Sequence, residues 1–127
     1  MLALPSLLWA VAPELARAQN LVLVTHPSVT LSASDVRDVY LGDKQLAGSV
    51  KLVPVDNSSS QEMFLARVVR IEGAKYASLW TKKSFREGIL APPLKGSDAE
   101  VLAFVRRTPG AVGYVGAPAA GVAVVQP

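Results

Sequence analysis

The sequence contains no cysteine among its 127 residues. This absence excludes disulfide bonds, thiolate metal sites and catalysis by a cysteine nucleophile. Only one histidine is present, His26, which argues against a Ser-His-Asp triad and excludes a metal site built from several histidines. His26 precedes a proline at the end of an apolar run, so we expect it in a loop.

Long apolar runs are also scarce, and the clearest one covers residues 2–11. It is followed by Ala16-Arg17-Ala18, a small-x-small box typical of signal-peptide cleavage, so residues 1–18 are predicted to be a signal peptide. The run is too short to span a membrane, and Pro5 and Pro13 disfavour a continuous helix. An ordinary N-terminal helix is the alternative. We expect export to the periplasm or beyond, and a single domain at residues 19–127.

Strong charge of either sign is missing as well, since 13 basic residues face 10 acidic ones. The densest basic cluster is Lys82, Lys83 and Arg86, which suits a small anion but fits a solvated helix face equally well. No nucleic-acid-binding motif is present. The carboxylates show no pairing typical of hydrolysis, and no nucleophile–base set is visible, so we do not expect an enzyme.

Short apolar runs alternate with segments of helical spacing along the chain. Strands are predicted at residues 21–25, 51–55, 112–115 and 121–125. Ser-x-x-acid capping boxes at residues 32–35, 59–62 and 97–100 predict three helix starts, and a further helix is expected at 74–85. Gly42 and Gly73 are expected to end the first two helices. This alternation predicts an α/β domain whose sheet is covered by helices.

The most informative segment is residues 53–64, VPVDNSSSQEMF, where a strand runs into a serine-rich turn before a helix. Unpaired backbone N–H groups and the helix dipole make such a turn suitable for an anion. Serines at a helix start are also ordinary caps, as Ser32 and Ser97 illustrate. The sequence alone leaves an anion site and a simple cap open.

Five blocks of the sequence together resemble a known family. They read LSASDVRDVYLG, VPVDNSSS, a helix that carries Trp80, GSDAEVLAFV and TPGAVGYV, in that order. The chain resembles the substrate-binding proteins of phosphate ABC transporters, which have the type II periplasmic binding protein fold, and it is most similar to short, single-lobe relatives. The resemblance implies a single α/β lobe with a mixed central sheet covered by helices.

The family binds its oxyanion at a loop that aligns with residues 56–60. Asp56 and Ser58 match the family pattern Asp-Gly-Ser-Gly-Thr, and Ser60 replaces its threonine with another hydroxyl. Asn57 and Ser59 replace the two glycines, which allow close backbone approach to a ligand. Pro54 replaces the family's arginine and so removes a bidentate cation. In the family, the residue matching Asp56 accepts a proton from the bound anion.

We therefore expect weak binding of phosphate or a similar oxyanion, and we expect no cofactor. The expected ligand-binding residues are Asp56, Asn57, Ser58, Ser59 and Ser60, with Lys82 or Arg86 as a nearby cation. One lobe cannot enclose an anion, so a second copy of the chain, a transporter, a porin or a sensor protein would complete the site. The alternative is an envelope interaction module that has kept the lobe and lost its ligand.

Overall fold

The computed structural model of the protein describes residues 20–126, so the predicted signal peptide at residues 1–18 lies outside the described residues. Its helices are α2 (Ala33–Tyr40), α3 (Gln61–Phe64), the π-helix η1 (Leu65–Val69), α4 (Gly73–Glu87) and α5 (Asp98–Arg107). Its strands are β1 (Val22–Thr25), β2 (Leu46–Ala47), β3 (Val50–Lys51), β4 (Val53–Pro54), β5 (Asp56–Asn57), β6 (Leu94–Lys95), β7 (Ala111–Val115) and β8 (Ala123–Val124). None of the helices in this part of the chain combines the length and the apolar character needed to cross a membrane.

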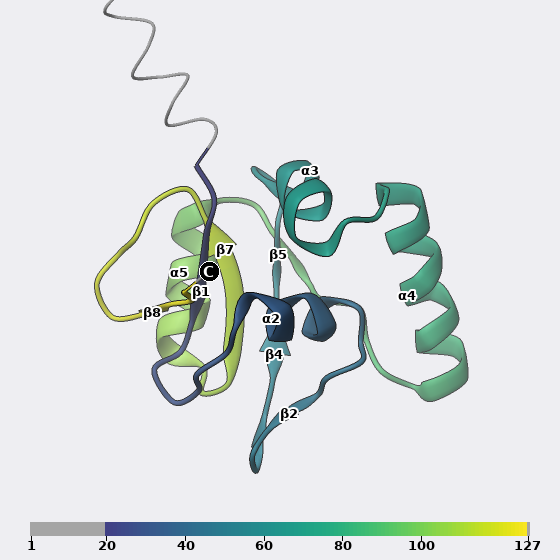
Figure 1. Cartoon of the computed structure of the whole chain (residues 1–127), viewed down its shortest axis with the longest axis horizontal. Coiled ribbons are helices and arrows are strands. Elements are labelled where there is room, and N and C mark those ends of the chain that lie inside the picture. Colours follow the sequence, from purple (N-terminus) through teal and green to yellow (C-terminus); the bar gives the residue numbers. More distant parts are fainter. Residues whose placement is uncertain (1–19, 127) are drawn as a thin grey trace, which may run out of the picture.

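A four-stranded mixed sheet with the order β4-β7-β1-β8 forms the centre (Figure 1). Strand β7 runs parallel to β4 and antiparallel to β1, and β1 is antiparallel to β8. All five residues of β7 are buried, as expected of a β-branched and aromatic strand with helices on both faces. The predicted strands at 21–25, 112–115 and 121–125 are thus confirmed, although the last is only two residues long.

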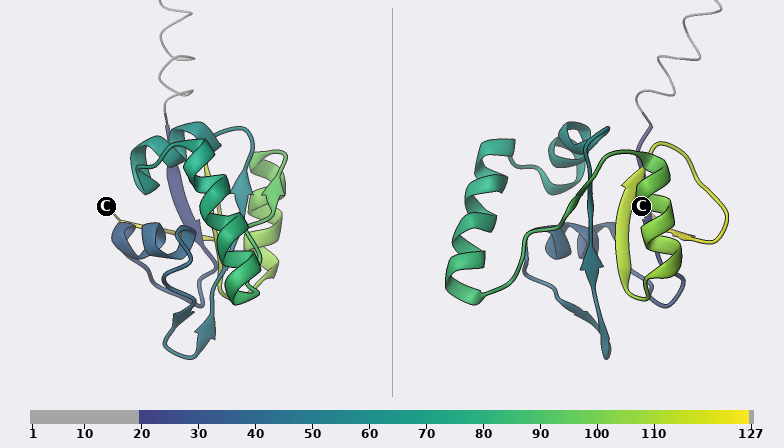
Figure 2. Two further views of the ribbon diagram at one scale, coloured as in Figure 1. Left: turned by 90° about the vertical axis from the view of Figure 1, so that its right-hand side faces the viewer. Right: turned by 180° about the vertical axis from the view of Figure 1, so that it is seen from behind.

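Alternate side chains of β7 pack into two different hydrophobic cores. On one face, Ala111 and Val115 pack with Val101 and Val105 of α5. Gly113 keeps this layer close, because a Cβ there would lie 2.7 Å from a methyl carbon of Val101. Seen from behind, α5 covers this face of β7 (Figure 2).

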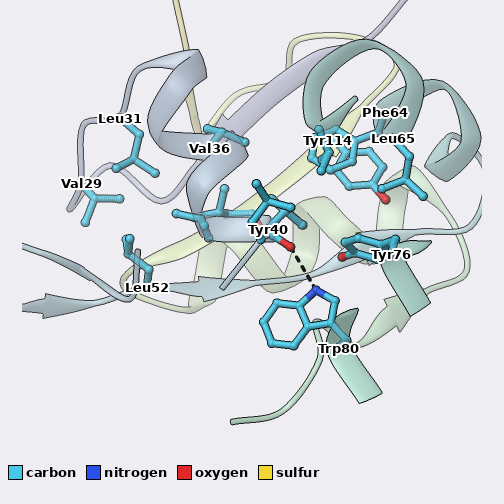
Figure 3. Packing of buried hydrophobic residues seen from close by; sticks show 14 residues of the cluster. Val29, Leu31, Val36, Tyr40, Leu52, Phe64, Leu65, Tyr76, Trp80 and Tyr114 are labelled. Carbon is cyan, nitrogen blue, oxygen red and sulfur yellow. Dashed lines mark hydrogen bonds between the residues drawn. The ribbon is translucent and has the colours of Figure 1, made fainter. Parts of the chain in front are cut away.

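On the other face, Val112 and Tyr114 pack with α2 and with the segment formed by α3 and η1. The ring of Tyr114 stacks on Phe64 with 3.9 Å between centroids, and Tyr40 meets Phe64 edge-on at 4.6 Å. The hydroxyl of Tyr40 lies 2.6 Å from the carbonyl oxygen of Val55, to which it donates. This aromatic cluster, shown in Figure 3, joins the sheet to its second helical layer.

The predicted strand at residues 51–55 does not exist as one strand. Lys51 ends β3, which forms a hairpin with β2, and Val53–Pro54 form β4 in the central sheet. Strand β5, which pairs in parallel with β6, begins only at Asp56. Leu52 and Val55, at the two breaks, are buried. Neither β2 nor β6 was expected, because two-residue strands carry no periodic signal.

The first predicted capping box is confirmed in full. The Ser32 Oγ accepts from the N–H of Asp35, the Asp35 carboxylate accepts from the N–H of Ser32, and both distances are 3.0 Å. Ser97 likewise accepts from the N–H of Glu100 at 3.2 Å. The Glu100 carboxylate, however, accepts from the N–H of Gly96.

The box predicted at residues 59–62 is wrong. The residue before α3 is Ser60, whose side chain makes no capping hydrogen bond. The α-helix also ends at Phe64 and continues as the π-helix η1, which stops at Arg70 in the left-handed conformation with φ 64°. Gly73 therefore begins α4, where it was expected to end the preceding helix.

Candidate functional site

Strand β5, which leads into the serine turn, begins with a buried carboxylate. Asp56 is only 2% exposed, and its Oδ2 accepts from the Tyr76 hydroxyl at 2.7 Å. Its Oδ1 accepts from the Tyr114 hydroxyl at 2.6 Å, and the Gln61 side chain adds a further hydrogen bond. Three elements, α4, β7 and α3, thus converge on one side chain.

Burial raises the pKa of Asp56 above its ordinary value, because the charged form loses its hydration. The hydrogen bonds from Tyr114, Tyr76 and Gln61 oppose this effect by stabilising the carboxylate. The pKa values of Tyr76 and Tyr114 are themselves raised, chiefly by burial and then by the nearby Asp56. Both phenols consequently stay protonated and remain hydrogen-bond donors.

Asn57 is fully buried and holds the turn in place. Its Nδ2 donates to Asp98 Oδ1 at 2.7 Å and to the carbonyl of Tyr114 at 2.9 Å. Its Oδ1 accepts from both the N–H and the hydroxyl of Ser59, at 3.1 and 2.6 Å. Asn57 thus gives the turn internal hydrogen bonds that a glycine at this position lacks.

The three serine amides donate within the protein and do not face an open site. The N–H of Ser58 donates to the carbonyl of Lys95, and that of Ser60 to the carbonyl of Asn57. The N–H of Ser59 is held by Asn57 Oδ1, as described above. The Ser60 Oγ is buried and has no hydrogen-bond partner in the described part of the chain. An anion cradle made of these amides would require the turn to rearrange.

Asp56 lines an open hollow of about 710 Å³ between α4 and the segment that contains β6. We name it the Asp56 hollow. Polar groups of Gln61, Tyr76, Thr81 and Ser84 share its lining, and Asp56 is the one charged residue among its described lining residues. Phe85 and Leu94, which are 92% and 58% exposed, stand at its rim.

Lys82 and Arg86 do not join this hollow. Each directly follows a lining residue, Thr81 or Phe85, and is turned roughly 100° from it around the helix axis. Both instead line a separate hollow on the other side of α4, together with Lys75 and Glu87. The structure brings Asp56, Asn57 and the three serines together, and it keeps the predicted cations away from them.

The sequence reasoning missed the two tyrosines that hold Asp56. Tyr76 falls within the helix predicted at residues 74–85, and it is buried, but its hydroxyl also contacts the site. A tyrosine in place of a phenylalanine at a core position was the available signal, since a buried hydroxyl needs a partner. His26 lies in a loop, and its Nδ1 is 2.8 Å from the Ser28 hydroxyl.

Two solved structures resemble this arrangement of elements. One is a protein described as a phosphate ABC transporter substrate-binding protein from Clostridium perfringens with bound phosphate. It has a TM-score of 0.64 and 16% identity over 84% of this chain and 44% of that one. The other is an ABC-type phosphate transport receptor from Vibrio cholerae, with a TM-score of 0.52, 17% identity, and coverage of 84% and 45%. This chain has the fold of phosphate-transporter substrate-binding proteins.

The predicted resemblance and the predicted mixed α/β architecture are thereby confirmed. At these identities the likeness establishes the fold, and the chain spans less than half the length of either neighbour. No protein-family profile matches the sequence. No curated protein matches it either. The ligand-binding role predicted for residues 56–60 stays a prediction.

Proposed function

We propose that this chain is an exported, non-enzymatic solute-binding-like domain that binds hydrogen phosphate, or a similar protonated oxyanion, weakly at the turn around residues 56–60. The observation that carries the proposal is the position of Asp56. Its carboxylate lines an open hollow at the start of α3, in a fold shared with a protein solved with phosphate bound. The small-x-small box at residues 16–18 supports export to the periplasm.

The chemistry of the turn favours an oxyanion that carries a proton. An ionised carboxylate has about four lone-pair positions, and three donors occupy Asp56, so one position is left for a ligand O–H. Hydrogen phosphate can donate such a proton, whereas sulfate cannot at neutral pH. The backbone N–H groups of Gln61 and Glu62, in the first turn of α3, have no carbonyl partner within that helix and are candidate donors for the remaining oxygens.

Binding is expected to be weak because no cation lines the hollow among the described residues. The serine amides are already engaged, and one open lobe leaves water in competition for every hydrogen bond. A second copy of the chain or an envelope partner such as a transporter would supply the missing positive charge and the missing wall. Lys82 and Arg86 of a second copy are candidates for that charge.

The test is a two-dimensional ¹H–¹⁵N NMR titration of the protein with phosphate and, separately, with sulfate at neutral pH. We expect saturable shifts of the amides at residues 58–63 with phosphate and much smaller shifts with sulfate. Asp56→Asn should remove the preference for phosphate, because an amide offers the ligand proton a weaker acceptor. Ser60→Ala should weaken phosphate binding if the unpartnered hydroxyl turns toward the ligand.

Ser78→Ala is the matched control, because Ser78 lies on the far side of α4 and lines the other hollow. It should leave the titration unchanged. Absence of saturable shifts up to about 50 mM phosphate, the range in which a site worth about 2 kcal/mol would fill, would contradict the proposal.

A second function, an interaction module without a ligand, is favoured by the exposed apolar rim. Phe85 and Leu94 present large apolar side chains to solvent beside the hollow, and such patches often mark interaction sites. A photoreactive residue at position 85 should crosslink to one envelope protein in living cells, whereas one at the exposed Ala66 should not. Equal crosslinking from both positions would count against this function.

A further inference from the structure

A second hollow, separate from the Asp56 hollow, lies between the β2–β3 hairpin and the loop that follows α4. Its volume is about 500 Å³, within the roughly 300–1,000 Å³ range of pockets that bind small molecules. We name it the hairpin hollow. In Figure 1 the hairpin and the end of α4 that border it lie on the same side of the molecule.

The hairpin hollow has an apolar interior. Leu52 and Trp80 are each 5% exposed, and Pro92 is buried beside them. Figure 3 shows Leu52 and Trp80, with the indole held by a hydrogen bond to the Tyr40 carbonyl at 3.0 Å. At the rim, Leu90 is 87% exposed, so an apolar ligand would shield a side chain that now faces water.

The charge of this hollow is wholly positive among its described lining residues. Lys44 and Lys51, on either side of the hairpin, are the charged residues that line it, and no carboxylate does. Neither lysine takes part in a salt bridge within the described part of the chain. Lys44 interacts electrostatically with Asp35, which lies outside the lining. The positive charge of Lys51 is therefore less compensated than that of Lys44.

We propose that the hairpin hollow binds a small amphipathic carboxylate. An apolar chain would lie against Leu52, Trp80 and Leu90, and the carboxylate would accept hydrogen bonds from Lys44 and Lys51. Buried apolar walls with a few placed polar groups are the usual composition of a ligand pocket. The Asp56 hollow has a carboxylate and no lysine in its described lining, so it lacks the cations that would hold a carboxylate ligand here.

Trp80 supplies the readout, because it lines the hairpin hollow directly. The chain has two tryptophans, so Trp9→Phe leaves emission from Trp80 alone. Octanoate, added below its micelle concentration at neutral pH, should change this emission saturably. Octan-1-ol should bind at least about tenfold more weakly, since about tenfold is the factor for losing one of the two charge-assisted hydrogen bonds.

Two double variants test the role of charge. Lys44→Met with Lys51→Met should weaken octanoate binding at least about tenfold and leave octan-1-ol binding unchanged. Lys75→Met with Lys82→Met makes the same change of net charge on the far side of α4 and should have no effect. Circular dichroism of each variant checks that the fold is kept.

Several outcomes would overturn the proposal. They are no saturable change with octanoate, equal affinity for octanoate and octan-1-ol, or an equal effect of the two double variants. If the emission of Trp80 changes with protein concentration in the absence of ligand, a second copy of the chain occupies the hollow instead. Asp56→Asn should not alter octanoate binding, so failure here is distinguishable from failure of phosphate binding.

Discussion

Asp56 is a buried carboxylate that has no cationic partner among the described residues and depends on neutral donors alone. Two phenols and an amide replace the hydration that folding removes. Neutral donors stabilise a carboxylate less than a salt bridge does, which is why burial outweighs them and the pKa is raised. The folded protein therefore binds a proton at this residue more readily than the unfolded chain.

The first prediction concerns stability against pH. Because the pKa of Asp56 is higher in the folded state, its contribution to stability is fully present below the ordinary value of 3.8. This contribution is lost as the pH rises from 3.8 through the raised pKa. Asp56→Asn removes the titration, so the free energy of unfolding of the wild type minus that of the variant should be larger at pH 3 than at pH 7. Each unit of pKa shift contributes about 1.4 kcal/mol to that change. Urea denaturation at both pH values measures it.

Glu62→Gln, at an exposed position in the first turn of α3, is the control for loss of a carboxylate. If the free energies of unfolding of wild type and Asp56→Asn differ by the same amount at both pH values, burial does not penalise the charged form of Asp56.

Residue types and local spacing identified the place of this carboxylate but not its partners. Asp56 and the serines stood out because a strand, a turn and a helix start follow one another directly in the sequence. Tyr76 and Tyr114 lie 20 and 58 residues away, and their contact with Asp56 depends on how α4 and β7 pack. The expected cations Lys82 and Arg86 line a different hollow, because they lie on another side of α4 from Tyr76 and Trp80.

Among the elements, the starts of α2 and α3 look alike in sequence and differ in structure. Both begin with Ser-x-x-acid, yet only Ser32 caps its helix. At α3, Asn57 occupies the hydroxyl and the N–H of Ser59, so the expected cap is unavailable. Sequence pattern predicted helix starts well and failed where a neighbouring side chain competed for the same hydrogen bonds.

The second prediction follows from this difference. Ser32→Ala should lower the free energy of unfolding by about 1 kcal/mol, the usual cost of losing a helix cap. Ser60→Ala should be neutral or stabilising, because it removes a buried hydroxyl that has no partner in the described part of the chain. Thermal or chemical denaturation of the two variants compares them directly. A larger loss for Ser60→Ala than for Ser32→Ala would contradict the assignment of the caps.

Across the whole molecule, the sequence predicted the layered α/β arrangement because β1, β7, α2, α4 and α5 each carry a clear periodic pattern. It did not predict the division of residues 50–57 among three strands, because two-residue strands carry no periodic signal and because β4 and β5 pair with β7 and β6, which lie far along the chain. Helix α4 shows a further property of the whole fold. It stands at one edge of the molecule in Figure 2, and Tyr76 and Trp80 are its buried residues.

The third prediction concerns the unequal attachment of the helices. Amide hydrogens of α4 should exchange faster than those of α5, because α5 packs on the central strand β7 and α4 does not belong to that layer. Trp80→Phe should speed exchange in α4 further by removing the indole N–H bond to Tyr40, and should leave α5 unchanged. Hydrogen exchange followed by mass spectrometry measures both. Equal protection of α4 and α5 in the wild type would mean that the two helices unfold only together.

Trp80 is also a wall common to the two hollows, since it lines both of them. While its indole stays bonded to the Tyr40 carbonyl, the two proposed ligands should bind independently. An occupant that displaces the indole reshapes both sides at once, and thermodynamic linkage makes the resulting coupling reciprocal. The 3.0 Å hydrogen bond between Trp80 and the Tyr40 carbonyl thus determines whether binding in one hollow affects binding in the other.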